Sequence, residues 1–282
     1  MEKISPFLLV ITFIVQLNVF SQTGWIQVYN GGSPSQNNVL DVTFVNQLTG
    51  FAAGGHPSLG YVLKTTNGGQ SWTTSLSTST ALQSLSFVSE NTGYVVGGYN
   101  PVSLIYKTTN GGQTWSQQIS GTQYCYFGSY FNENTGIIVG DWGSIRKTTN
   151  GGNTWFGCTS GTPDYLESIC FIDQNTGFSA GREGQIVKTT NGGNNWNPLI
   201  QVGTWLNSIK FLNENIGYAV GKSGMVLKTT NGGGGWQIMS MGISYDLWNI
   251  FLLNQNLIYI VGDYGNVLKT VNGGMNWTIQ NV

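Results

Sequence analysis

Charge is scarce in this chain. Asp, Glu, Lys and Arg make up 8% of the 282 residues, against about 25% in an ordinary soluble domain. Only two arginines are present, Arg146 and Arg182, and the formal net charge is −1. A protein that binds a phosphate backbone needs a basic surface, so we expect no nucleic-acid partner.

Cysteine and histidine are scarce too. The three cysteines, Cys125, Cys158 and Cys170, form no CxxC pair, and His56 is the one histidine. A disulfide framework is therefore excluded as the organising principle, although an oxidising compartment would allow one pair to form. We expect the cysteines to be small buried side chains, and we expect neither a metal nor another cofactor.

Long hydrophobic runs are absent apart from one near the N-terminus. Residues 7–15 are apolar after a short polar start, and Ser21 offers a small residue at a cleavage position. This layout is typical of a secretory signal peptide, and the run is too short for a membrane-spanning helix. We expect a signal peptide over 1–21, cleavage before Gln22, and an exported protein without a membrane span in the periplasm, on the cell surface or outside the cell. The alternative is an uncleaved anchor.

Glycine and aromatic residues are abundant. The chain has 41 glycines and ten tryptophans, and aromatics reach 13%. This composition excludes disorder, and the glycines are not spaced every third residue as in collagen. Internal repetition is the dominant signal. The block at 64–72 returns at 107–115, 147–155, 188–196, 228–236 and 269–277, which places the tryptophans 40 to 43 residues apart.

Each repeat reads as four short strands. An apolar alternation such as 209–211 is followed by an Asn-rich turn, a run ending in Gly such as 217–221, and a tight hairpin loop. In the third repeat we read this loop as the two residues between Gly140 and Gly143. A Val-Leu-Lys run follows, and then the block whose Trp opens a fourth run. Such runs bounded by Gly and Asn predict an antiparallel meander. A period near 40 residues then predicts a β-propeller. We expect a single all-β domain over 22–282 with six blades. The alternative is seven blades with one incomplete, since 24–28 reads as a surplus strand.

The recurring block resembles the Asp-box of the bacterial-neuraminidase repeat, with Asn at the place of Asp. The Asn, Gly and Trp residues that carry the resemblance are Asn67, Gly69, Trp72, Asn110, Gly112, Trp115, Asn150, Gly152, Trp155, Asn191, Gly193, Trp196, Asn231, Gly233, Trp236, Asn272, Gly274 and Trp277. We expect a structural role: Asn bonds nearby backbone N–H groups, Gly accepts positive φ, and Trp buries a large ring. The lysine that opens each block is expected to pack its stem and keep its charge in water.

The whole repeat also resembles the photosystem II assembly and stability factor family. That resemblance implies an exported propeller that escorts membrane-protein subunits without catalysis. This sequence departs from the family pattern in two ways: the family has seven blades and an arginine-rich docking face. The fold is therefore expected from the resemblance, and the photosynthetic role is not.

Catalytic patterns are few. The Asp-box suggests a sialidase, but that activity relies on three arginines to hold its substrate, and this chain has two. His56 lies in no Gly-x-Ser-x-Gly context. Loop carboxylates leave a second hypothesis open, a glycoside-active enzyme; they are Asp141, Glu183 and Asp263 at predicted hairpin tips, and Asp164, Glu167 and Asp246 in loops between blades.

Aromatics in predicted loops suggest where a ligand binds. The candidates are Tyr124, Tyr165 and Trp205 ahead of inner strands, Trp142 and Tyr264 at hairpin tips, and Trp248 near the last inner strand. They form either a shared recognition platform or plugs between blades. We expect a monomeric, non-enzymatic module that binds a protein or glycan. The third hypothesis is a structural part of a larger surface assembly.

Overall fold

The computed structural model describes residues 38–99, 102–118, 125–239 and 241–280. The predicted signal peptide and the strand expected at 24–28 lie outside these residues. The chain forms two compact units: one reaches Tyr126, and the other spans Phe127–Gln280.

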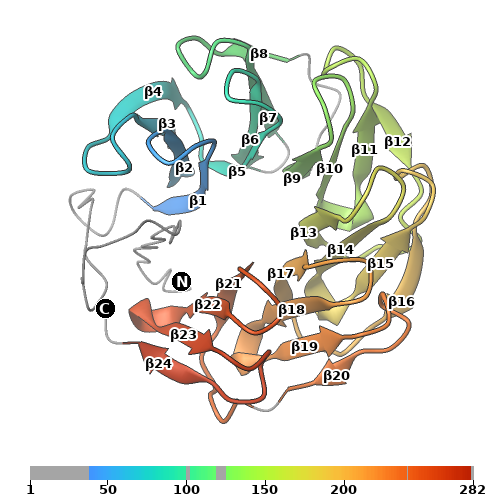
Figure 1. Ribbon diagram of the computed structural model, residues 1–282. Coiled ribbons are helices and arrows are strands. Elements are labelled where there is room, and N and C mark those ends of the chain that lie inside the picture. The colour runs from blue at the N-terminus through green and yellow to red at the C-terminus, as the bar shows by residue number, and fades with distance from the viewer. Residues whose placement is uncertain (1–37, 100–101, 119–124, 240, 281–282) are drawn as a thin grey trace. The chain divides into compact units, whose positions relative to one another are not determined.

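The described residues form six four-stranded sheets, in which the strands pair in chain order (Figure 1). Blade 1 consists of β1 (Val39–Phe44), β2 (Gly50–His56), β3 (Leu59–Thr65) and β4 (Thr73–Thr78). Blade 2 consists of β5 (Leu82–Phe87), β6 (Gly93–Tyr99), β7 (Val102–Thr108) and β8 (Ser116–Gln117). These two blades belong to the first unit.

Blade 3 starts at the unit boundary with β9 (Cys125–Tyr130) and continues through β10 (Gly136–Gly140), β11 (Ile145–Thr148) and β12 (Phe156–Cys158). Blade 4 consists of β13 (Leu166–Phe171), β14 (Gly177–Gly181), β15 (Ile186–Thr189) and β16 (Asn197–Ile200). Blade 5 consists of β17 (Leu206–Phe211), β18 (Gly217–Gly221), β19 (Val226–Thr229) and β20 (Gln237–Ile238). Blade 6 consists of β21 (Leu247–Leu252), β22 (Ile258–Gly262), β23 (Val267–Thr270) and β24 (Thr278–Gln280). Four 3₁₀ turns follow the second strands of blades 3 to 6: η1 (Asp141–Gly143), η2 (Arg182–Gly184), η3 (Lys222–Gly224) and η4 (Asp263–Gly265).

The second strand of each blade in the second unit is the most buried element. Every residue of β10, β14 and β18 is buried. A strand covered on both faces needs a continuous apolar run rather than alternation, and the runs ending in Gly supply one. Side chains from consecutive blades make one core: Phe178 of β14, for example, stacks on Phe211 of β17 with ring centroids 4.0 Å apart.

A glycine opens most second strands because an aromatic ring lies against it. A Cβ on Gly177 would come within 2.6 Å of the Phe171 ring, and one on Gly217 within 2.6 Å of the Phe211 ring. The same ring then meets the block Trp of its own blade edge-on, as Phe211 meets Trp236 at 5.9 Å and 88°. The Trp therefore packs against a ring of its own repeat, and it also contacts the core of the preceding blade, as Trp196 does beside Ile137.

Each of the six repeats supplies its own fourth strand, so none depends on the segment around 24–28 to complete a sheet. The fold is a six-bladed, all-β propeller, as the sequence predicts, and the seven-blade alternative is not adopted.

The recurring block forms one turn, repeated six times with the same bonds. In blade 1, Thr65 Oγ1 donates to Asn67 Oδ1 at 2.9 Å and accepts the Gly69 N–H at 2.9 Å. Asn67 Oδ1 also accepts the Ser71 N–H at 2.9 Å. The equivalent three bonds recur in the other five blades. The glycines have positive φ, 90° at Gly69. The predicted local geometry is therefore confirmed, and it explains why Asn replaces Asp: the turn needs an acceptor oxygen, and no charge.

The lysine that opens the block has a different role from the expected one. Lys188 Nζ lies 5.1 Å from the Phe178 ring centroid of its own blade and donates to the Gly232 carbonyl of the next blade's turn at 2.8 Å. Lys64 and Lys228 make the same bond to the carbonyls of Gly111 and Gly273, and Lys147 donates to the side-chain oxygen of Asn194 in the next blade's turn. The expectation that these amines stay in water is wrong, because each of the four ties two consecutive blades together.

Candidate functional site

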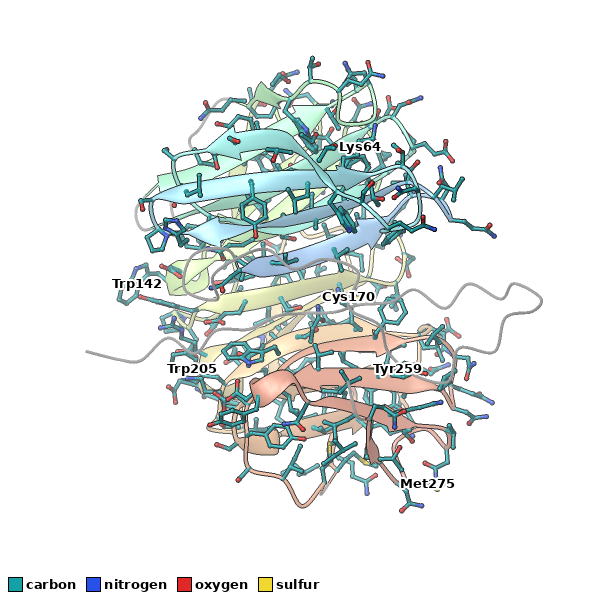
Figure 2. All side chains as sticks on the ribbon, turned by 90° about the vertical axis from the view of Figure 1, so that its left-hand side faces the viewer. Lys64, Trp142, Cys170, Trp205, Tyr259 and Met275 are labelled. Carbon is teal, nitrogen blue, oxygen red and sulfur yellow. The ribbon has the colours of Figure 1, made fainter. Side chains whose placement is uncertain are left out.

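In the second unit, the blades have two different ends. Trp142 and Trp205 lie on one side of Figure 2, and Tyr259 and Met275 lie on the other. Met275 belongs to the turn of the recurring block, which repeats in every blade. The opposite end carries the hairpins between second and third strands and the loops that enter the first strands. Its residues differ from blade to blade, and we call this end of blades 3 to 6 the tip face.

Each hairpin on the tip face holds a non-glycine residue in the left-handed region. In blade 3, Ser144 N–H donates to the Asp141 carbonyl at 3.0 Å, and the two residues between them, Trp142 and Gly143, have φ of 57° and 64°. Positive φ at both central positions is the requirement of a type I′ turn. The central pair is thus one residue later than the two-residue loop predicted from the sequence. Glu183, Ser223 and Tyr264 occupy the position of Trp142, with φ of 55°, 55° and 61°.

A ladder of aromatic and cationic side chains runs across blades 3, 4 and 5. Trp142 meets the Tyr165 ring edge-on at 5.0 Å. Arg182 lies between two rings, with Cζ 4.1 Å from the centroids of both Tyr165 and Trp205. Lys222 Nζ also lies over the Trp205 ring, 3.6 Å from its centroid. Cations over aromatic faces are attracted by the ring quadrupole, so the ladder joins the tips of neighbouring blades.

The arginine of this ladder is also paired. Arg182 Nε donates to Glu167 Oε1 at 2.9 Å. Arg182 and Lys222 are further positioned by their backbones, because their N–H groups donate to the carbonyls of Tyr165 and Trp205 at 2.9 Å. The loop and the hairpin tip of each blade are therefore held together by the main chain, and the side chains stack as a consequence.

Blade 6 uses the same backbone bond with different side chains. Asp263 N–H donates to the Asp246 carbonyl at 2.9 Å. The Trp248 indole N–H donates to Asp263 Oδ1 at 2.6 Å, and Asp246 Oδ1 accepts the Ser223 N–H of blade 5 at 2.9 Å. Tyr264 at the tip is 81% exposed. Blade 6 thus presents carboxylates and exposed rings together.

The structure divides the aromatics that the sequence singled out. Tyr124 lies outside the described residues. Tyr165 and Trp205 are half-buried against the tips of neighbouring blades, whereas Trp142, Trp248 and Tyr264 are exposed by 64%, 40% and 81%. Whether an aromatic lies in a loop or in a strand is therefore a poor guide to its exposure, since loop aromatics do pack between blades. Sequence reasoning missed Arg182 and Lys222, whose only signal was their place one residue after the Gly that ends a second strand.

Two carboxylates of the tip face interact electrostatically. Burial raises the pKa of Asp141, the Arg182 guanidinium lowers it, and the Glu167 carboxylate raises it, with a net upward shift. Asp173, by contrast, caps a loop at the other end of blade 4, and the backbone N–H groups of Asn175 and Thr176 lower its pKa. Asp141 is thus the tip carboxyl whose charge the surroundings disfavour.

Other candidate chemistry is dispersed. His56 ends β2, with Nδ1 3.2 Å from Ser58 Oγ. Cys158 and Cys170 are free thiols. Nowhere in the described segments do three or more His, Cys, Asp and Glu side chains gather in a group that could hold a metal ion. In the same part of the chain, no helix has the length and apolar character that crossing a membrane requires.

Comparisons with known proteins agree with the fold. The family model described as Photosynthesis system II assembly factor YCF48 matches residues 18–155 and 158–282. No curated protein matches the sequence. Among solved structures, "YCF48 bound to D1 peptide" is 18% identical with a TM-score of 0.69, over 86% of this chain and 81% of that one. "YCF48 from Cyanidioschyzon merolae" is 16% identical with a TM-score of 0.73, over 92% of this chain and 88% of that one.

A glycoside hydrolase shares the same architecture. The GH74 enzyme of Niastella koreensis is 16% identical with a TM-score of 0.64, and the match covers 88% of this chain and 38% of the enzyme. Identities this low show the fold alone. The family model, in contrast, covers nearly the whole sequence, and the chain belongs to the Photosynthesis system II assembly factor YCF48 family.

Proposed function

We propose that this protein is a non-enzymatic binding module that holds an extended segment of a partner protein on the tip face. The observation that carries the proposal is the pair of exposed aromatics, Trp142 and Tyr264, at left-handed turn positions. A bulky residue with positive φ is an outlier that the surrounding structure must stabilise. Asn or Gly would serve the turn at lower energy, so the rings have a reason other than stability.

Aromatic side chains suit the recognition of an extended chain. They bury a large area and lose little conformational entropy, and they dominate the energetics of recognition surfaces. The ladder beside Trp142 supports such a role, because Arg182 and Lys222 fix the rings of Tyr165 and Trp205 in place before a partner arrives. A preorganised surface spends less binding free energy on ordering itself.

Family membership supports a peptide as the occupant. One of the similar structures is a YCF48 protein bound to a D1 peptide. We carry over from it only the class of partner, an extended polypeptide. The D1 sequence is not carried over, because 18% identity is too low to infer that two proteins recognise the same peptide sequence.

The test separates binding from folding by using residues that suit the turn. Trp142→Asn and Tyr264→Asn each remove a ring and place at the tip a residue that tolerates left-handed backbone. Peptides selected from a displayed random library against the native protein are the probe. We expect both variants to melt at or above the native temperature and to lose at least tenfold in peptide affinity. Ser223→Asn, at the same turn position in blade 5, is the matched control. Affinity unchanged in both ring variants would refute the proposed surface.

A glycoside-active enzyme is the second candidate, and one observation favours it. Asp141 has a raised pKa beside a second carboxylate, Glu167, which resembles the acid and base pair of glycosidases. The ion pair between Glu167 and Arg182 argues the other way, because it uses the second carboxylate for structure. Hydrolysis of a panel of β-glucans and other glycans, lost in Asp141→Asn, would establish this candidate in place of the first.

We also propose that the protein is exported, on the strength of the apolar run at 7–15 and the small residue Ser21. Mass spectrometry of the protein from its native cells should find an N-terminus at Gln22 in a fraction outside the cytoplasm. An intact N-terminus in the cytosolic fraction would overturn this. The remaining alternative, a passive part of a surface assembly, predicts no affinity for isolated peptides.

A further inference from the structure

Each copy of the recurring block contains an asparagine followed by a glycine. The six pairs are Asn67–Gly68, Asn110–Gly111, Asn150–Gly151, Asn191–Gly192, Asn231–Gly232 and Asn272–Gly273. In such a pair the backbone nitrogen of the glycine can attack the side-chain carbonyl carbon of the asparagine, because the glycine has no Cβ to obstruct the approach. An asparagine followed by glycine is therefore especially open to deamidation, and the bonds around each copy decide how fast it reacts.

Two sets of bonds restrain the reacting groups in every copy. The glycine nitrogen, which is the nucleophile, donates its hydrogen to a carbonyl of the turn between the first two strands, as Gly232 does to Asn215 at 3.0 Å. The asparagine Oδ1 accepts two bonds, which for Asn231 come from the Thr229 hydroxyl at 3.0 Å and the Gly235 N–H at 2.9 Å. Both sets must open before the two groups can react, so they slow deamidation alike in all six blocks.

The leaving group, the asparagine amide nitrogen, is restrained in three of the six blocks. In blade 3 the amide nitrogen of Asn150 donates to the Thr154 hydroxyl at 2.8 Å, and blades 1 and 2 make the same bond to Ser71 and Thr114. Blades 4, 5 and 6 lack a hydroxyl at this position, which holds Asn195, Gly235 and Asn276. Within the described residues, the amide nitrogens of the block asparagines in these three blades have no hydrogen-bond partner.

Blade 5 has the least restrained block of these three. Its asparagine is followed by four consecutive glycines, 232–235, which have more backbone freedom than any other residue type. In the described part of the chain, Trp236 Nε1 is buried without a partner, whereas Trp196 and Trp277 each donate to the carbonyl of a block glycine at 3.1 Å. Asn231 is exposed, so water can reach it.

We propose that Asn231 is a deamidation site, and that it reacts before the other five block asparagines. The Gly232 backbone nitrogen attacks Asn231 Cγ and gives up its proton, the bond from Cγ to Nδ2 breaks, and ammonia leaves with that proton. The five-membered succinimide that results takes up one water molecule. Opening of the ring on one side gives aspartate. Opening on the other side gives isoaspartate, in which the main chain runs through the former side chain.

The two products have different consequences for the turn. Aspartate keeps the oxygen that accepts the bonds from Thr229 and Gly235, and the amide donor that it loses makes no bond. Isoaspartate adds one carbon to the main chain between Thr229 and Gly233, whose hydrogen bond closes the turn. It also displaces Gly232, which accepts the bond from Lys188 of blade 4. The reaction therefore converts this block into the Asp-box that it resembles, or it weakens the contact between blades 4 and 5.

Peptide mapping by mass spectrometry tests the site in the native sequence. The folded protein is incubated in mildly alkaline buffer and then digested at acidic pH, where new deamidation is slow, and isoaspartate is counted separately by enzymatic methylation. We expect Asn231 to react roughly twofold to tenfold faster than Asn150, because one ordinary hydrogen bond fewer must break. Asn150 is the matched comparison, since it is also exposed. No deamidation, equal rates in all six blocks, or an earlier reaction at any other block asparagine would overturn the assignment.

Substitutions at Gly235 separate the missing hydrogen bond from the flexible backbone. Gly235 lies outside the left-handed region, and a Cβ there would have Asn231 Nδ2 as its nearest neighbour, at 3.7 Å. Gly235→Thr therefore supplies the hydroxyl that Thr154 supplies in blade 3, and it should slow the reaction at Asn231 to the rate at Asn150. Gly235→Val has the same shape without the hydroxyl, and it should leave Asn231 faster than Asn150.

The reverse change tests the same bond in blade 3. Thr154→Val removes the hydroxyl that accepts the Asn150 amide bond and keeps the side-chain shape. It should speed the reaction at Asn150 by the factor that separates Asn150 from Asn231 in the native protein. Equal rates at Asn231 in Gly235→Thr and Gly235→Val, or an unchanged rate at Asn150 in Thr154→Val, would show that the amide bond does not control the reaction and would refute the inference.

Discussion

The glycine at the sixth position of the recurring block offers a sharp test of how the blades pack. Gly233 and Gly274 make the same turn, with φ of 81° and 88°, and each donates its N–H to a Thr hydroxyl at 3.0 Å. Their surroundings differ. A Cβ on Gly233 would lie 2.8 Å from Phe178 Cε1, and a Cβ on Gly274 would have its nearest neighbour at 3.5 Å, an ordinary contact.

Alanine at these two positions should therefore cost different amounts of stability. Left-handed backbone costs an alanine roughly 1–2 kcal/mol at either site. At Gly233 the methyl group also meets a ring that cannot move away, because Phe178 is fully buried and stacks on Phe211 at 4.0 Å. Overpacking of this kind adds roughly 1–3 kcal/mol. We expect a loss of about 1–2 kcal/mol for Gly274→Ala and about 2–5 kcal/mol for Gly233→Ala.

Urea unfolding followed by circular dichroism and tryptophan fluorescence measures both losses. Gly203→Ala is the control for backbone strain alone, since Gly203 has a φ of 76° and a Cβ there would meet nothing within 4 Å. Equal losses in all three variants would refute the packing argument and leave only the backbone term. Little loss in any of them would refute the turn geometry itself.

Three further predictions concern single side chains. Trp236→Phe should cost less stability than Trp196→Phe. The buried Trp236 indole N–H has no acceptor, whereas Trp196 Nε1 donates to a carbonyl at 3.1 Å. The melting temperatures of the two variants, each compared with the native protein, test this. Lys188→Met, which keeps the stem and loses the bond to Gly232, should lower the free energy of unfolding by roughly 1.5–3 kcal/mol, and a loss below about 0.5 would show that the bond is solvated in solution. The folded-state pKa of Asp141 is raised, so its contribution to stability is lost as pH rises through that pKa. The melting temperature of Asp141→Asn should therefore be higher than that of the native protein at pH 7 and equal to it at pH 3. A lower melting temperature of the variant at pH 7 would contradict the upward shift of the pKa.

The fold was predictable because the repeated signals are local. Thr, Asn, Gly and Trp within eight residues specify their own turn, and six copies at a near-constant spacing specify the blades. The bonds within each block confirm this residue by residue, as at Asn67, whose Oδ1 accepts both the Thr65 hydroxyl and the Ser71 N–H. Little tertiary context is needed for such an inference.

Contacts between repeats were less predictable for the same reason. Lys188 reaches a carbonyl 44 residues away, and Arg182 stacks on two rings contributed by different blades. Spacing along the chain gives no sign that these groups meet. The tip turn is a further case: the central pair is Trp142 and Gly143, one residue later than the loop read from the sequence, because Gly140 still pairs within the hairpin by donating to the Ser144 carbonyl.

The two ends of a blade are under different constraints, and this difference is the reason for proposing the binding surface at the tip end. At the block end, the first Thr, the Asn and the second Gly complete the bonds of the turn, and these residues are the same in all six copies. At the tip end, the backbone requires only positive φ at two positions. Glycine takes the second in every described tip of blades 3 to 6, as Gly143 does, and the first varies among Trp142, Glu183, Ser223 and Tyr264. A position that is strained in every copy and yet varies freely is not selected for the stability of the turn. Two aromatics there, and acids in blade 6 where blades 4 and 5 carry cations, are most simply explained by the chemistry of what the tip face holds.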